Sequence, residues 1–271
     1  MIPTPHQSAA NCRTKTSTLN RILFTALKAL GVLAFWLILW ELAALRIGKE
    51  LILPSPVQVF SLLFKMLFEK ATWQKAGLSL LRIGIGYISG ITLGVLLSLL
   101  TCRFKICDIF LSPVIRTVRA TPVASFIILV MLWVNKGIVP GVMVLLMTAP
   151  LVWENICAQY RAADKKLIEM GRAYAFSHTK MLRLIYLPQC LPGFFSGCIN
   201  SVGLAWKSGI AAEVLCQPDA AIGSELYFSK IYLETPSLFA WTAVVIILSF
   251  ILEKLIRFLL NKLSKEREAA R

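Results

Sequence analysis

Long stretches without a charged residue are the feature of this sequence that most limits its fold. Five such runs occur, at 83–102, 120–135, 137–153, 184–206 and 235–252. About 20 apolar residues are enough for a helix to cross the hydrocarbon core of a bilayer. A sixth run, 22–45, contains Lys28 and Glu41 near its ends but is fully apolar from Ala29 to Trp40. We therefore predict an all-α, polytopic membrane protein with six transmembrane helices.

The distribution of positive charge predicts the topology of these spans. The formal net charge of +15 could suggest a nucleic-acid partner, but the charges are not spread evenly. Twenty of the 29 Lys and Arg residues lie before span one, between spans two and three, between spans four and five, or after span six, against seven on the other side. Basic loops stay in the cytoplasm during insertion. We therefore expect a multi-pass protein of the cytoplasmic membrane with both termini inside, and no nucleic-acid role.

Three regions follow along the chain. Residues 1–20 are polar and rich in Ser and Thr, which predicts a disordered cytoplasmic N-terminus. Residues 21–261 form the predicted transmembrane domain, and 262–271 a basic cytoplasmic tail. The first apolar run leads into "ELAALRIG" rather than a clear cleavage site, so we expect it to be retained. Seven cysteines without a Cys-x-x-Cys pair and two isolated histidines predict neither a disulfide framework nor a metal site.

Local patterns add detail to the spans. The two prolines of "LPSP" (53–56) predict a turn, and 57–70 has the apolar spacing of an amphipathic helix at the outer surface. In span two, Gly86, Gly90 and Gly94 recur every fourth residue, a spacing that lets membrane helices approach closely. We expect this face to pack within the chain rather than against a second copy. The turn "NKG" (135–137) predicts a hairpin of spans three and four.

The segment 164–188 differs from the rest because charged, aromatic and apolar residues are mixed in it. Its spacing predicts two short amphipathic helices separated near residue 175, with Pro188 ending the second. The first has an apolar face of Leu167, Met170, Gly171 and Tyr174. On the basic side of the membrane these helices would form a compact projection, and the alternative is that they lie on the membrane surface.

This segment resembles the cytoplasmic signature loop of ABC-importer permeases. That loop reads Glu-Ala-Ala, three residues, Gly, nine residues, Ile-x-Leu-Pro. The matching positions here are Glu169, Met170, Gly171, Ala175, Ile185, Leu187 and Pro188. The resemblance implies that they couple the chain to an ATPase. Alanine adopts positive φ less easily than glycine, so we expect the bend at Ala175 to differ from that of the family.

The resemblance extends over residues 35–261 and is specific to the nitrate/sulfonate/taurine branch of these permeases. The matching stretches are "LWELA" (39–43), "LPSP" (53–56), "SLLRIGIGY" (79–87), "RATPVASFIILVMLW" (119–133), "LPQCLPGFFSG" (187–197) and "AWKSGIAAEVL" (205–215). It implies a type I ABC-importer permease fold in the inner membrane of a prokaryote. The implied partners are a second permease copy forming a homodimer, two cytoplasmic ABC ATPase subunits and an extracytoplasmic solute-binding protein.

The chain carries no nucleotide-binding loop of its own. The string nearest to Gly-x-x-x-x-Gly-Lys-Ser/Thr is "GLAWKS" (203–208), which has Trp206 in place of the second glycine. We therefore expect no cofactor and no catalytic residue in this chain, with ATP and Mg²⁺ bound by the partner. An ion-driven secondary transporter is an alternative, but internal repeats are absent. A membrane-embedded enzyme is another, but no polar catalytic constellation is evident.

Two ionisable residues of span five are assigned to the translocation path. Lys207 would lie about 24 Å along a helix that starts at Leu191, and charges inside membranes often mark solute paths. We expect it to favour an anionic solute; snorkelling to the outer interface is the alternative. Glu213 does not share its face and is expected at a gate or a loop contact. Arg82 is expected to be a headgroup anchor. Sulfonates, taurine, nitrate and small nitrogenous heterocycles all remain possible solutes.

Overall fold

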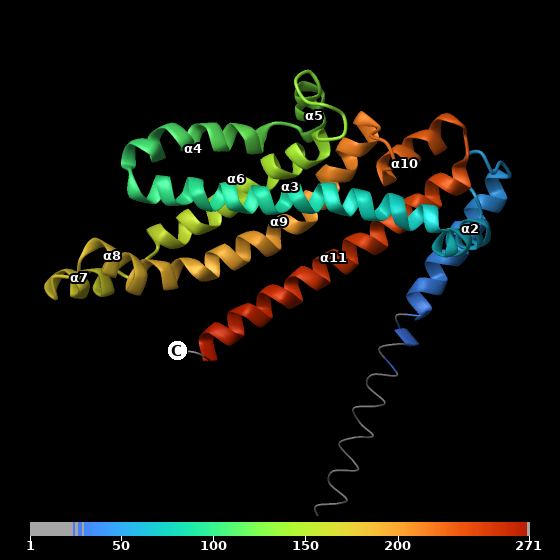
Figure 1. Ribbon diagram of the computed structural model, residues 1–271. Coiled ribbons are helices and arrows are strands. Elements are labelled where there is room, and N and C mark those ends of the chain that lie inside the picture. The colour runs from blue at the N-terminus through green and yellow to red at the C-terminus, as the bar shows by residue number, and fades with distance from the viewer. Residues whose placement is uncertain (1–23, 25–26, 29, 270–271) are drawn as a thin grey trace, which may run out of the picture. The chain divides into compact units, whose positions relative to one another are not determined.

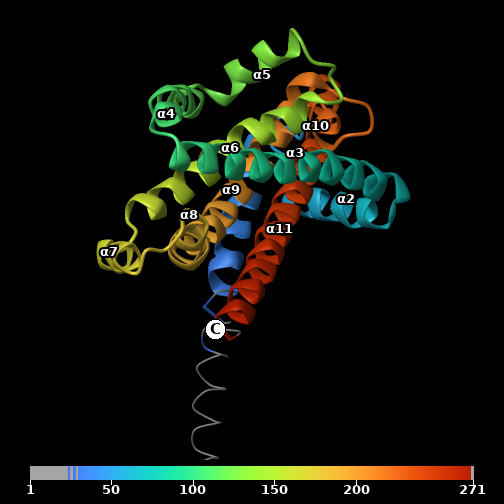
Figure 2. The same ribbon diagram turned by 60° about the vertical axis from the view of Figure 1, so that its left-hand side comes forward.

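The structure is a computed structural model that describes residues 24, 27–28 and 30–269. Every regular element in these ranges is a helix, as the sequence predicts (Figure 1, Figure 2). The chain divides into two compact units, with the boundary between Leu62 and Leu63. The predicted disordered segment 1–20 lies outside the described residues. The predicted tail is helical as far as Ala269, because the last helix continues to that residue.

In the first unit, one helix, Leu30–Ile47, corresponds to the predicted first span. Its apolar side chains are largely exposed, as on a helix surrounded by lipid. The predicted turn at "LPSP" is confirmed, and the indole N–H of Trp40 donates to the carbonyl of Pro54 at 3.1 Å.

The amphipathic helix expected after this turn is α2 (Pro56–Phe68). Its first turn is a capping box. The N–H of Gln58 donates to the hydroxyl oxygen of Ser55 at 3.3 Å, and the N–H of Ser55 donates to Oε1 of Gln58 at 3.1 Å. Pro56 occupies the first helical position, where its missing N–H costs nothing.

The second unit is built around α3 (Lys70–Arg103), α6 (Val139–Arg161) and α9 (Leu187–Cys216), which pack closely on one another (Figure 1). The glycine stripe of α3 faces α6. A Cβ added at Gly90 would lie 2.8 Å from the Cβ of Thr148, and one added at Gly94 would lie 2.7 Å from the carbonyl oxygen of Ala149. Larger residues would push the two helices apart, so the predicted packing of this face within the chain is confirmed.

The region predicted as the third span is not one continuous helix. Within 120–135 the main helix is α5 (Val123–Met131); α4 (Lys105–Ala120) precedes it, and the axes of the two helices differ in direction by 104°. Thr121, which precedes Pro122 at the bend, has an extended backbone, because proline disfavours a helical residue before it. The nine residues of α5 are about 14 Å long, too short to cross a bilayer alone. The prediction of a single span at 120–135 is therefore wrong.

The segment 164–188 contains α7 (Lys165–Ala173) and α8 (His178–Met181), which lie beyond one end of α6 and α9 (Figure 1, Figure 2). The prediction that Pro188 ends the second helix is wrong. A π-helical turn, η1 (Leu182–Tyr186), joins α8 directly to α9, and Pro188 lies in the first turn of α9. A π turn widens the helix locally, which accommodates a ring that would clash in a regular α-helix.

The chain ends with α10 (Ile222–Ile231) and α11 (Thr235–Ala269). Among the described residues, three helices are long and apolar enough to cross a membrane, namely Leu30–Ile47, α3 and α6, and the bent pair α4–α5 would make a fourth. The predicted fifth span runs from the end of η1 into α9, and the sixth falls within α11. The structure thus supports a polytopic membrane protein, while the count of six spans stays a prediction.

Candidate functional site

The projection 164–188 begins with a capped helix that is attached to α9. Oδ1 of Asp164 accepts the N–H of Lys166 at 2.8 Å and so caps α7. The N–H of Asp164 itself donates to the side-chain oxygen of Gln189 at 2.9 Å. Since Gln189 lies in the first turn of α9, the start of α7 is held by a direct bond to that long helix.

At its other end α7 closes in a Schellman motif centred on Ala175. The N–H of Phe176 donates to the carbonyl of Gly171, and the N–H of Ala175 to the carbonyl of Arg172, both at 2.9 Å. Ala175 has a φ of 50°, in the left-handed region that favours glycine. The expectation of a bend that differs from the family's stays a prediction, but alanine does not prevent a positive φ here. The alanine adopts the glycine conformation, at a cost of about 1–2 kcal/mol.

Gly171 and Ile185, two of the predicted coupling residues, lie inside the projection. Both are buried. A Cβ at Gly171 would come within 2.6 Å of Sδ of Met181 and 2.9 Å of Cδ1 of Ile185. A glycine at this position therefore lets α7 pack closely on α8 and η1.

The residues that the projection presents to the outside form an apolar face on α7. Leu167, Met170 and Tyr174 have the i, i+3, i+7 spacing of one helical face, and Tyr174 is 72% exposed. Glu169 is exposed beside them, as are Leu187 and Ala175, while Pro188 is half-buried. An exposed apolar face on a short helix is typical of a surface that packs against another protein or against the membrane.

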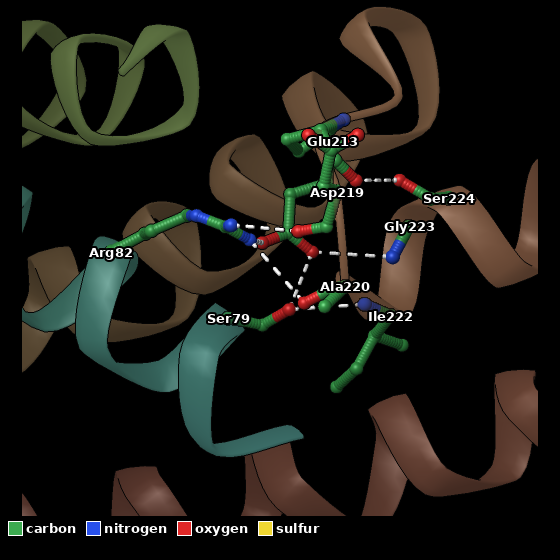
Figure 3. A network of polar contacts seen from close by, with 9 residues as sticks. Ser79, Arg82, Glu213, Asp219, Ala220, Ile222, Gly223 and Ser224 are labelled. Carbon is green, nitrogen blue, oxygen red and sulfur yellow. Dashed lines mark hydrogen bonds and ion pairs between the residues drawn. The ribbon is translucent and has the colours of Figure 1, made fainter. Parts of the chain in front are cut away.

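A cluster of polar groups lies at the end of α9 that is far from the projection. With 30 residues, α9 is about 45 Å long. There the side chain of Glu213 is completely buried. Its Oε2 accepts the hydroxyl of Ser79 at 2.8 Å and the N–H of Gly223 at 3.2 Å (Figure 3). The hydroxyl oxygen of Ser79 accepts the N–H of Ile222 at 3.0 Å. Glu213 therefore contacts the loop after α9, one of its two expected roles, while its part in the path stays a prediction.

Arg82 of α3 holds the same loop from the other side. Its Nη2 donates to the carbonyl of Asp219 at 2.8 Å, and its Nη1 donates to the carbonyl of Ala220 at 3.5 Å and lies 3.8 Å from Oε1 of Glu213 (Figure 3). The expectation that Arg82 is a lipid headgroup anchor is therefore wrong. The Asp219 side chain also pairs with Lys136, Nζ to Oδ1, at 2.9 Å.

Lys207 lies on the surface of the second unit between buried Trp206 and Ser208. It continues an exposed polar stripe on α9 that includes Ser196 and Asn200, and Nδ2 of Asn200 donates to Oγ of Ser196 at 3.3 Å.

A negative charge from α11 stands beside the same stripe. A Cβ at Gly203 would lie 2.8 Å from a carboxylate oxygen of Glu253, so the end of the Glu253 side chain covers this glycine. Sequence reasoning singled out Lys207 but missed both the stripe and Glu253. In the part of the chain that the structure describes, no group of three or more His, Cys, Asp or Glu residues could hold a metal.

Comparison with known proteins finds that this chain is similar to several transport permeases. Curated relatives include an aliphatic sulfonates transport permease protein, SsuC, of Bacillus subtilis (strain 168), 23% identical over 90% of this chain and 88% of that protein. The taurine transport system permease protein TauC of Escherichia coli (strain K12) is 25% identical over 87% of this chain and 88% of its own length. The nitrate import permease protein NrtB of Synechocystis sp. (strain PCC 6803) is 25% identical over 68% of this chain and 70% of its own.

Among solved structures, an amino acid ABC transporter crystallised with histidines has a similar fold. The TM-score is 0.57 at 17% identity, and the match covers 68% of this chain and 90% of that one. The model of one protein family matches residues 90–265, which include α4 to α10, the projection and Glu213. The chain therefore belongs to the family of binding-protein-dependent transport system inner membrane components.

Proposed function

We propose that this chain is the path-forming permease of an ATP-driven importer and that the projection 164–188 is its contact with the ATPase. The observation that carries the proposal is the exposed apolar face of Leu167, Met170 and Tyr174, on a helix that lies beyond the ends of α6 and α9. A groove in a cytoplasmic partner would bury that face. The spacing of the signature loop, from Glu169 to Pro188, coincides with the same projection.

The proposed topology has six spans and cytoplasmic termini. The spans are Leu30–Ile47, α3, the bent pair α4–α5, α6, α9 and α11. The basic residues of the projection, together with Arg103 and Lys105 where α3 meets α4, support a cytoplasmic position for the projection and for that junction. Because α9 connects the projection to the Glu213 cluster, this cluster then lies at the outer surface.

The proposed assembly contains two copies of the permease, two ATPases and an outer solute-binding protein. The polar stripe of Ser196, Asn200 and Lys207 supports a second copy, since these residues are exposed on the surface of a single chain. Facing a second stripe, they would line an aqueous path rather than lipid. Dependence on a binding protein follows from the family to which the chain belongs.

The solute that we propose is a small molecule with a sulfonate-like or nitrate-like anionic group. Lys207 supplies a positive charge on the stripe, and relatives named for sulfonates, taurine and nitrate point the same way. Glu253 places a negative charge nearby. A solute that carries an amino group as well as its anionic group, as taurine does, would match both charges.

Coupling requires that ATP binding favour one conformation of the permease over the other, because a ligand shifts an equilibrium only by its differential affinity. The unbroken helix from η1 through α9 offers a direct mechanical connection. Closure of the ATPase pair would displace α7, and the attached α9 would carry the displacement across the membrane.

Purification of the complex from membranes tests this proposal. The double variant Leu167→Gln/Met170→Gln should lose the ATPase subunit during affinity purification, because the apolar contact is removed while the fold of α7 is kept. Thr179→Gln is the control, since Thr179 is exposed on α8 of the same projection rather than on α7. Retention of the ATPase by the double variant would refute the assigned contact. Absence of any ATPase from the wild-type preparation, with uptake that responds to an ion gradient, would favour a secondary transporter.

A further inference from the structure

We propose that Ser79 and Glu213 are positioning residues that fix the loop 217–221 and the start of α10 to the outer ends of α3 and α9. The loop and the start of α10 form part of the outer surface, where the solute arrives. This surface then moves as one body with α3 and α9 during transport. The assignment of this surface to the outer side rests on the proposed function. The identity of the groups that hold the loop does not depend on the proposed function, because it follows from the observed contacts.

The burial of Glu213 shows that its contacts are specific. A carboxylate removed from water is stable only when hydrogen bonds or opposite charges replace its hydration. Oε2 has two donors, Ser79 and Gly223, and Oε1 faces the guanidinium of Arg82 at 3.8 Å (Figure 3). All of these groups come from α3 or from the beginning of α10. Movement of either element away from α9 would remove some of the partners that replace the hydration of the carboxylate.

The same contacts supply a cap that α10 lacks. The first amides of a helix need acceptors, which a Ser, Thr, Asp or Asn at the preceding position usually provides. Here that position is Ala221, which has no side-chain acceptor. The amides of Ile222 and Gly223 bond instead to Ser79 of α3 and Glu213 of α9. The negative charge also lies at the positive end of the α10 dipole. Side chains of α3 and α9 therefore cap the N-terminus of α10.

Close packing reinforces these bonds. A Cβ at Gly223 would approach the backbone nitrogen of Val214 to 2.6 Å, so α10 and α9 are in backbone contact here. Within the loop, the hydroxyl of Ser224 donates to the carbonyl of Pro218 at 2.6 Å. Asp219 is held twice: Lys136, from the turn before α6, pairs with its carboxylate, and Arg82 of α3 donates to its backbone carbonyl. The loop thus has anchors on α3, on α9 and on the turn before α6.

Cys216 offers a native reporter of this attachment. It is buried at the last residue of α9, directly before the loop, and is 6% exposed. While the loop stays attached, a membrane-impermeant maleimide added from outside should react slowly with this thiol. Detachment would expose it. Mass spectrometry of the peptide that contains Cys216 separates its reaction from that of the other six cysteines.

The experiment uses the complex in right-side-out membrane vesicles. Glu213→Leu and Ser79→Ala should speed the labelling of Cys216 about ten-fold or more, since loss of a buried hydrogen bond shifts a local opening equilibrium by that order. Glu213→Gln keeps an acceptor for Ser79 and Gly223 and should label at nearly the wild-type rate. Ser89→Ala is the matched control on α3, because the Ser89 hydroxyl bonds only to the Ile85 carbonyl of its own helix.

Two results would overturn the proposal. One is labelling of Glu213→Leu and Ser79→Ala at the wild-type rate. The other is a wild-type Cys216 that becomes reactive when MgATP and vanadate, loaded inside the vesicles, trap the complex, because a loop that moves with α3 and α9 keeps the thiol covered in both states. Copurification of the ATPase, measured on the same preparations, tests the proposed function independently. If the ATPase does not copurify, the difference in Cys216 labelling rate between the variants should still be observed.

Discussion

Ser79 and Glu213, which are 134 positions apart in the sequence, share a buried hydrogen bond of 2.8 Å between the hydroxyl of one and the carboxylate of the other. The Ser79 hydroxyl uses both of its capacities, because it also accepts the N–H of Ile222. One small side chain therefore connects α3, α9 and α10. Only a group that both donates and accepts can fill this position without leaving a buried partner unsatisfied.

The first prediction concerns the stability that this hydroxyl contributes. Ser79→Ala leaves a carboxylate oxygen short of one donor and the Ile222 amide without an acceptor, so the free energy of unfolding should fall by about 1–3 kcal/mol. Thermal unfolding of the purified protein in detergent measures the change. Ser89→Ala should stay within about 0.5 kcal/mol of wild type, because Ser89 is only half-buried and its hydroxyl bonds to its own helix. Equal midpoints for the two variants would contradict the role given to Ser79.

The second prediction concerns the left-handed residue of the projection. Ala175→Gly removes the cost of a positive φ and should stabilise the projection by about 1 kcal/mol. Ala173→Gly, two positions earlier in the helical part of α7, should destabilise it by about 0.5–1 kcal/mol. Tryptic cleavage in the projection should become slower in the first variant and faster in the second. Shifts of the same sign would contradict the conformation of Ala175.

The third prediction concerns the close approach of α7 to α8. In Gly171→Ala the new methyl group displaces the ends of the Met181 and Ile185 side chains, and after the gain in helix propensity the net cost should be about 1 kcal/mol. The ATPase should copurify less well as a result. Gly77→Ala on α3 is the control, because a Cβ there has open space around it. If the ATPase is retained equally in both, the packing of Gly171 does not shape the contact surface.

The sequence was sufficient to predict features that depend on local spacing. The glycine stripe of α3 needs only a four-residue period to indicate a packing face, and the turn at "LPSP" needs only its prolines. The signature spacing placed the projection correctly within the chain. In each case the residues that form the structural feature lie within one or two helical turns of the residues that predict it.

Some features were missed because they depend on partners far apart in the chain, and others because the local signal is weak. Nothing local to Arg82 indicates the carbonyls of Asp219 and Ala220, 137 and 138 residues away. The continuity of α9 through Pro188 was missed because a single π turn leaves no periodic signal. The part of α4 in the bent pair was missed because α4 begins at Lys105, well before the uncharged run 120–135 that was counted as the span.

The last prediction concerns the charges of the proposed path. Lys207→Met should raise the KM for uptake of an anionic solute about ten-fold or more, since hydrogen bonds to charged groups contribute about 1.5–3 kcal/mol. Lys207→Arg keeps the charge and should lie much closer to wild type. Glu253→Gln should weaken uptake of an aminosulfonate such as taurine more than uptake of a sulfonate without an amino group. Radiolabelled uptake into vesicles measures all three variants. An unaltered KM and maximal rate in Lys207→Met would show that this side chain faces lipid headgroups rather than the solute.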